Sequence, residues 1–173
     1  MEESIGKEYL SNAIQEFRNL KKLAEKAMAQ LEPNDYHWQP DKESNSIAII
    51  IKHLRGNMIS RWTDFLTTDG EKPDRNRDDE FIDDIDPVES LMSEWERGWD
   101  CLFNTLSGLK GEDLLKTVFI RGEPHSVIKA MNRQISHYSN HVGQIVYISK
   151  HLKTDSWKSL SIPRGKSADY FPK

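Results

Sequence analysis

The sequence has only one cysteine, Cys101, so no disulfide bond can form within the 173-residue chain. It also has no long apolar run, since the longest, residues 47–51, is followed directly by Lys52 and His53. A membrane-spanning helix needs about 20 apolar residues, and the first residues, MEESIGKEYL, lack the apolar core of a secretion signal. From these absences we expect a cytoplasmic protein without a membrane partner.

Basic clusters are missing as well. The formal net charge is −4, with 24 Lys and Arg residues against 28 Asp and Glu residues. Proteins that bind nucleic acid usually carry a basic face, so we expect no nucleic-acid partner. The hydrophobic share of 36% and the charged share of 30% are ordinary for a folded protein. The length and the lack of internal repeats predict a single domain over residues 1–173.

Four segments carry apolar residues at steps of three and four, which is the period of an amphipathic helix. These segments are residues 4–31, 46–66, 87–106 and 124–152. Pro33 ends the first, Ser44 or Asn45 can cap the second, and Pro87 suits the first turn of the third. We therefore predict an all-α fold, a four-helix bundle.

The connections are long for a bundle. Residues 69–86 contain nine acidic and three basic residues, which is typical of a solvated loop rather than an ion site, and we expect this segment to cross an end of the protein. The stretch TVFIRG before the last helix favours a short extended hairpin. We expect the C-terminal tail to wrap the surface, anchored by Trp157 and Ile162. The predicted bundle therefore has long crossover loops.

The fourth segment contains the motif HYSNH, which places His137 and His141 one helical turn apart. At that spacing two imidazoles can reach one metal ion at about 2.0–2.1 Å each. The glutamate that follows the first histidine in helical zinc proteases is missing here, so that mechanism lacks its base. Because such a pair can arise by chance, a metal site needs a third ligand from elsewhere.

His53 is the candidate third ligand. It lies within IIIKHLRGNM, and Asn57, Ser60 and Asp64 follow it along one flank of the helix. This polar ridge either faces solvent, in which case His53 points to water, or lines an internal site. Two histidine-bearing helices of a bundle can bring three ligands together. Three neutral imidazoles leave open coordination positions, as in catalytic metal sites.

The remaining histidines and the cysteine carry weaker signals. His37 lies in a loop, His125 at the start of the last helical segment and His151 at its end, so we expect structural or surface roles for all three. Cys101 lies away from the apolar stripe of its helix, and we expect a partly exposed thiol without a nucleophilic role.

These features resemble a known family. The helix SNSIAIIIKHLRGNM with its central histidine, the acidic crossover and the last helix with HYSNHVGQIVYI look like the DinB-like superfamily of bacterial four-helix bundles. The segments SIA…HLRGN…RW and HVGQIVYISKHL…W…LSIPRGKS are similar to an uncharacterised branch common in Bacillus. The resemblance covers nearly the whole chain.

The resemblance implies a divalent metal ion, either nickel, zinc, iron or manganese, bound by His53, His137 and His141. Better-understood members are transferases that use a low-molecular-weight thiol such as bacillithiol, or isomerases that use mycothiol, and many are homodimers. The resemblance thus implies a metal-dependent enzyme, a thiol S-transferase with a small-molecule substrate, and a homodimer. A metal-dependent hydrolase and a non-catalytic bundle that binds metal or a partner remain as alternatives.

Catalytic residues beyond the metal ligands stay unassigned. Arg61, Arg164 and Lys166 are candidates to stabilise developing negative charge, the last two if IPRGKS folds over the site. Asn57, one turn after His53, either orients a bound ligand or faces solvent.

Overall fold

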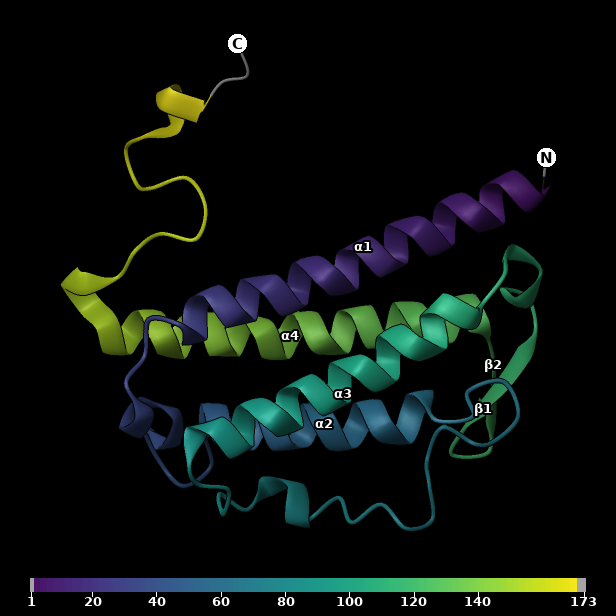
Figure 1. The fold of residues 1–173 in the computed structure, drawn as a ribbon, viewed down its shortest axis with the longest axis horizontal. Helices are drawn as coiled ribbons and strands as arrows, with labels where there is room; N and C mark the ends of the chain where they lie inside the picture. Colours follow the sequence, from purple (N-terminus) through teal and green to yellow (C-terminus); the bar gives the residue numbers. More distant parts are fainter. Residues whose placement is uncertain (1, 171–173) are drawn as a thin grey trace.

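The computed structural model describes residues 2–170, with side chains from residue 5 onward. This part of the chain forms four long helices (Figure 1), α1 (Glu2–Met28), α2 (Ile47–Trp62), α3 (Val88–Gly108) and α4 (Val127–Lys153). An antiparallel hairpin of β1 (Thr117–Ile120) and β2 (Glu123–Ser126) precedes α4. The predicted helical bundle with a short hairpin before its last helix is confirmed. Across the described residues, we find no helix that combines the length and the apolar character of a membrane span.

Serine side chains begin the second and fourth helices. The hydroxyl oxygens of Ser46 and Ser126 each accept a hydrogen bond from the amide three residues later, at 3.1 and 3.2 Å. Each bond satisfies an N–H group that has no partner inside its helix. The cap of α2 is therefore Ser46 itself, not Ser44 or Asn45.

The segment that joins α2 to α3, residues 63–87, is called the crossover below. It begins where Asp64, with a φ of 49°, takes a left-handed conformation that ends α2 before the predicted residue 66. Figure 1 shows α2 and α3 running in the same direction, opposite to α1 and α4. Because parallel neighbours cannot be joined by a tight turn, the crossover returns along the length of α2, and the prediction that it crosses an end of the protein was wrong.

A buried polar chain joins α2 to α4 in the core. The indole N–H of Trp62 donates to the Tyr138 hydroxyl at 3.0 Å, and that hydroxyl donates to the side-chain oxygen of Asn57 at 3.1 Å. Buried polar groups that are satisfied in this way fix the relative position of the elements that carry them. Asn57 lies one turn after His53, and Tyr138 directly follows His137. The chain therefore sets the spacing between two of the predicted metal ligands.

The crossover is also tied to the hairpin. The hairpin turn consists of Arg121 and Gly122, with φ angles of 57° and 74°, as a two-residue type I′ turn requires. The Asp69 carboxylate accepts hydrogen bonds from both turn amides, at 2.8 and 2.7 Å. Gly70 N–H donates to the Phe119 carbonyl at 2.7 Å. These contacts bring the start of the crossover and the turn to the same end of the bundle.

Candidate metal centre

Three histidine rings from two helices converge at the middle of the bundle. The Nε2 atom of His137 lies 3.2 Å from Nε2 of His53 on α2 and 3.1 Å from Nε2 of His141 on α4. One ring nitrogen from each histidine lies within 4.8 Å of the others. His53 is only 5% exposed, so the alternative in which it points to water is excluded. The structure thus brings together the three residues that the sequence predicts.

The outer nitrogens of two rings are held by hydrogen bonds. Nδ1 of His53 donates to Oε2 of Glu80 at 2.9 Å, and Nδ1 of His141 donates to Oε1 of Gln144 at 2.9 Å. In a neutral ring, a proton on Nδ1 leaves Nε2 with a lone pair. The Nε2 lone pairs of His53 and His141 therefore face the space around His137. Partners that fix the ring orientation in this way are typical of histidine metal ligands.

The geometry fits a single divalent metal ion. Three nitrogens that each bind one ion at 2.0–2.1 Å lie about 2.8–3.0 Å from one another in facial octahedral coordination and about 3.3–3.4 Å in tetrahedral coordination, or about 2.8–3.4 Å in all. The two measured separations, 3.1 and 3.2 Å, fall in this range. Neutral imidazoles suit zinc, copper, iron and nickel as ligands, whereas manganese prefers oxygen ligands.

Glu80 is the principal site residue that the sequence analysis missed. It lies in the acidic crossover, which was predicted to be solvated, but its side chain is 5% exposed and contacts His53. Arg75 donates to both of its oxygens, at 2.7 and 2.8 Å. Burial opposes ionisation of Glu80, but the hydrogen bonds from Arg75 and His53 outweigh it and lower the pKa of the carboxyl group below its ordinary value. The carboxylate is therefore ionised and holds His53.

One sequence feature could have signalled this contact. Gly56 interrupts α2 one turn after His53, and a glycine inside a helix costs about 1 kcal/mol relative to alanine. A Cβ atom at Gly56 would lie 2.7 Å from Cδ of Glu80. The glycine therefore makes room for the buried carboxylate, which is the kind of close approach that an isolated glycine can mark.

The other two histidines have pKa values below the ordinary value of 6.5. Burial, followed by the neighbouring rings of His141 and His53, lowers the pKa of His137 to about 3. Burial likewise lowers the pKa of His141, against the opposing effect of its bond to Gln144. Both rings are thus neutral at pH 7, so a metal ion does not have to displace a proton from either of them.

This burial predicts how the metal-free protein responds to acid. Between its ordinary pKa of 6.5 and about 3, His137 binds a proton only when the chain is unfolded, so the free energy of unfolding falls as the pH drops below 6.5. Uptake of one proton on unfolding lowers the free energy of unfolding by at most about 1.4 kcal/mol for each pH unit. Urea unfolding of chelator-treated protein between about pH 6.5 and 5, where most carboxylates do not yet titrate, measures this slope. We expect a flatter slope in His137→Gln and an unchanged one in His151→Gln, and equal slopes in all three proteins would contradict the prediction.

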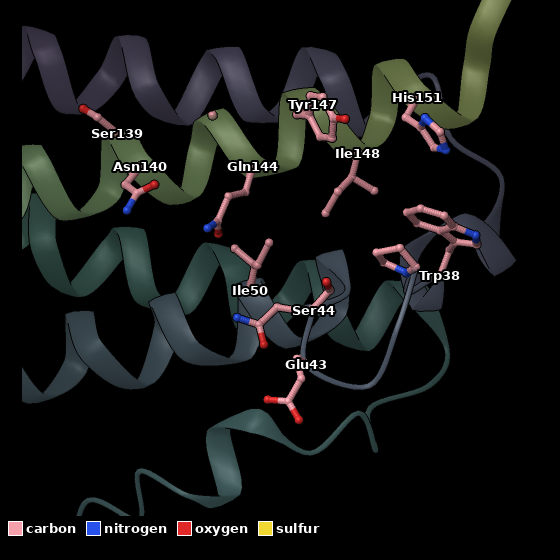
Figure 2. A pocket seen from close by; sticks show the side chains of 13 residues that line it. Trp38, Glu43, Ser44, Ile50, Ser139, Asn140, Gln144, Tyr147, Ile148 and His151 are labelled. Carbon is pink, nitrogen blue, oxygen red and sulfur yellow. The ribbon is translucent and has the colours of Figure 1, made fainter.

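A groove lies between α2 and α4 on one side of the histidines (Figure 2). Its volume is about 770 Å³. Figure 2 shows Gln144 and Ile50 facing each other across it, with Trp38 and His151 at one end. The Trp38 and His151 rings lie 5.2 Å apart, centroid to centroid. Gln144 also binds His141, so the groove is separated from the candidate metal centre by this side chain, and none of the three histidines lines it.

A second pocket lies on the other side of the histidines, toward the hairpin. It has a volume of about 330 Å³, and His53 and His137 form part of its wall. We call it the arginine pocket because five arginines from the crossover, the hairpin and helices α2 and α4 line it: Arg61, Arg75, Arg77, Arg121 and Arg133. The predicted residue Arg61 is thus beside the site, although it donates to the Gly70 carbonyl and to Glu71.

The predicted position of the tail over the site is wrong, whereas Asn57 is buried next to the site. Arg164 and Lys166 are exposed in the C-terminal tail, which Figure 1 shows leaving the far end of α4 on the side of α1, away from α2. Trp157 packs against the core as expected, but Ile162 is 47% exposed and does not anchor the tail. Asn57 does not face solvent, because it is buried and its oxygen binds Tyr138, and it lines the arginine pocket together with His53 and His137.

The remaining histidines lie outside the cluster, as predicted. His37 binds Asp83 of the crossover at 2.7 Å, and His151 is exposed beside Trp38. His125 is buried in β2. Cys101 is partly exposed, and its Sγ lies 3.6 Å from the Thr63 hydroxyl.

Comparison with known proteins gives a family but no activity. No curated protein matches the chain, and no solved structure matches it. One family matches over residues 4–166, and its description is "Protein of unknown function (DUF1572)". This match covers the four helices, the crossover and all three histidines of the candidate centre. The chain therefore belongs to the DUF1572 family.

Proposed function

We propose that this protein is a DinB-like, divalent-metal-dependent enzyme that transfers a low-molecular-weight thiol, such as bacillithiol, to an electrophilic small molecule. The observation that carries the proposal is the convergence of three Nε2 atoms at the wall of an open pocket, which His53 and His137 line. Ligands from the protein on one side and open space on the others are typical of catalytic rather than structural metal sites.

Each site residue has a defined task in this proposal. His53, His137 and His141 would hold the ion, while Glu80 and Gln144 keep two of the rings in the tautomer that presents Nε2. The bound cation would supply Lewis acidity that lowers the pKa of a coordinating thiol or water. Since all three ligands are neutral, its positive charge is not offset by a protein ligand, which favours an anionic thiolate.

The hydrogen bonds that occupy both oxygens of Glu80 favour thiol transfer over hydrolysis. Water has a much higher ordinary pKa than a thiol, about 15.7 against about 8.5, so hydrolysis depends more strongly on a base that takes a proton from the attacking water. Both oxygens of Glu80, the carboxylate bound to His53, already accept hydrogen bonds from Arg75. A thiol attacks as the thiolate and needs no such base once its proton is lost. The groove on the side of Gln144 offers an apolar and aromatic surface for the electrophile.

The test is thiol consumption by metal-loaded protein. With bacillithiol and 1-chloro-2,4-dinitrobenzene, the thiol sulfur forms a bond to the aryl carbon, chloride leaves with the bonding electron pair, and the thiol proton passes to the buffer. We expect metal-dependent loss of free thiol that matches the chloride released, and no such loss after chelation. Metal-dependent cleavage of ester substrates without thiol loss would indicate a hydrolase instead. Bound metal without either reaction would indicate a non-catalytic bundle.

Two further properties belong to the same proposal. A thiol cosubstrate that stays reduced places the enzyme in the cytoplasm. The resemblance also implies a homodimer, which light scattering during size-exclusion chromatography would measure directly.

A further inference from the structure

The arginine pocket concentrates positive charge in a chain whose net charge is negative. Its five arginines come from four separate elements, while the protein as a whole carries a formal charge of −4. Arg61 and Arg75 are largely buried, with side chains 6% and 5% exposed. Charges that are partly removed from water and face a small cavity act strongly on any ion within it.

The neighbouring carboxylates offset only part of this charge. Glu71 is shared by Arg61 at 3.0 Å, Arg121 at 2.9 Å and Arg75 at 3.3 Å. Glu80 is shared by Arg75 and His53. Even with Asp69, which binds the hairpin turn, three carboxylates stand against five guanidinium groups.

Two of the five arginines have no acidic partner among the residues whose side chains are described. Arg77 on the crossover and Arg133 on α4 are exposed, and within residues 5–170 neither forms an ion pair. Both line the pocket together with His53 and His137. Guanidinium groups bind carboxylate and phosphate oxygens in pairs, which is why arginine is common where such groups are recognised. The unpaired arginines are thus free to bind an anion beside the histidines.

Unsatisfied polar atoms in the pocket wall point the same way. Gln134 is 3% exposed, and its Oε1 has no hydrogen-bond partner among the described residues. Nε of Arg61 is buried and also lacks a partner in this part of the chain. A buried polar atom without a partner costs about 1–3 kcal/mol. An anion oxygen would satisfy the Arg61 Nε donor, whereas Oε1 of Gln134 is an acceptor and needs a donor, such as a hydroxyl group of the same ligand.

We propose that the arginine pocket binds the carboxylate or phosphate group of a substrate, with Arg77 and Arg133 as the specificity-determining residues. The anion site itself stands on the pocket alone. The further statement, that the reacting end of the same molecule reaches the three histidines, rests on the proposed function. In a thiol transferase, the anionic group would belong to the thiol, because the opposite groove presents the apolar surface suited to the electrophile.

The test measures anion binding to full-length, chelator-treated protein by isothermal titration calorimetry at constant chloride concentration. Inorganic phosphate and malate are the two probes, which distinguish a phosphate from a dicarboxylate ligand. We expect saturable binding of one of them, about tenfold weaker in Arg133→Gln and in Arg77→Gln. Arg164→Gln, an exposed arginine in the tail, is the matched control and should bind as the unaltered protein does. Circular dichroism melts would show that the variants fold.

Several results would overturn the inference. These are the absence of saturable binding for both probes, equal affinities in Arg133→Gln and Arg164→Gln, or binding that appears only after metal loading and is lost in His141→Ala alone. The two proposals can also fail separately. Anion binding without thiol transfer would remove the proposed function and leave the anion site. Thiol transfer with an unchanged KM for the thiol in Arg133→Gln would overturn the assignment of the anionic group to the thiol and leave the function.

Discussion

Replacing His137 with alanine is expected to abolish stoichiometric metal binding. Structural zinc sites with four ligands contribute about 10–16 kcal/mol, or roughly 3 kcal/mol per ligand, so the loss of one ligand weakens binding about a hundredfold or more. His137 is the central ring, since its Nε2 is the atom that approaches both of the other two. Elemental analysis of protein purified without chelator should fall from about one equivalent of metal to a small fraction.

The control for this experiment lies on the same helix. His151 is fourteen residues further along α4, exposed and outside the cluster, so His151→Ala should keep its metal. Alanine is a better helix former than histidine, and His137→Ala should fold normally. If His137→Ala retained a full equivalent of metal, or if the unaltered protein bound none after loading at neutral pH, the three histidines would not be a metal site.

Gly56→Ala is expected to weaken metal binding about ten- to a hundredfold although it removes no ligand. The added Cβ would lie 2.7 Å from Cδ of Glu80, so the carboxylate must move and release Nδ1 of His53. Loss of the partner that orients a metal-binding histidine usually costs affinity in this range. Competition with a fluorescent chelator would measure the change.

Gly143→Ala is the matched control for this second prediction. Gly143 lies on α4 two residues after His141, and a Cβ atom there meets nothing within 4 Å. This variant should keep the metal affinity and gain up to about 1 kcal/mol of stability from helix propensity.

A double-mutant cycle with Glu80→Gln tests the mechanism. Both changes act on the bond between Glu80 and His53, so the second should add little to the first. Fully additive losses would mean that Gly56→Ala acts in some other way.

The sequence correctly predicted the features that depend on residues close together in the chain. Apolar residues at helical spacing predicted the four helices, and HYSNH predicted two rings on one strip of α4. His53 remained ambiguous because polar residues surround it on α2. The structure resolves the ambiguity with the crossover, which covers that side of the helix and buries Lys52 as well as His53.

The missed residues depend on contacts between distant segments. Glu80 looked like one more charge in an acidic run, and only the parallel direction of α2 and α3 places it against His53, 27 positions earlier. The arginine pocket likewise collects Arg77, Arg121 and Arg133 from three elements. No periodicity within one segment indicates that such residues meet, because their proximity follows from the path of the chain between the helices.

The crossover is attached to α2 partly by exposed ion pairs, whereas the helices are held together by apolar packing. Lys52 binds Asp84 at 2.7 Å and Asp79 at 3.3 Å, and both aspartates are about half exposed. Attraction between charges near water is screened by dissolved salt, whereas apolar packing between helices is not. A rise in salt concentration therefore weakens the attachment of the crossover while the packing of the helices stays intact. Because Glu80 lies on the crossover, its hydrogen bond to His53 weakens as well.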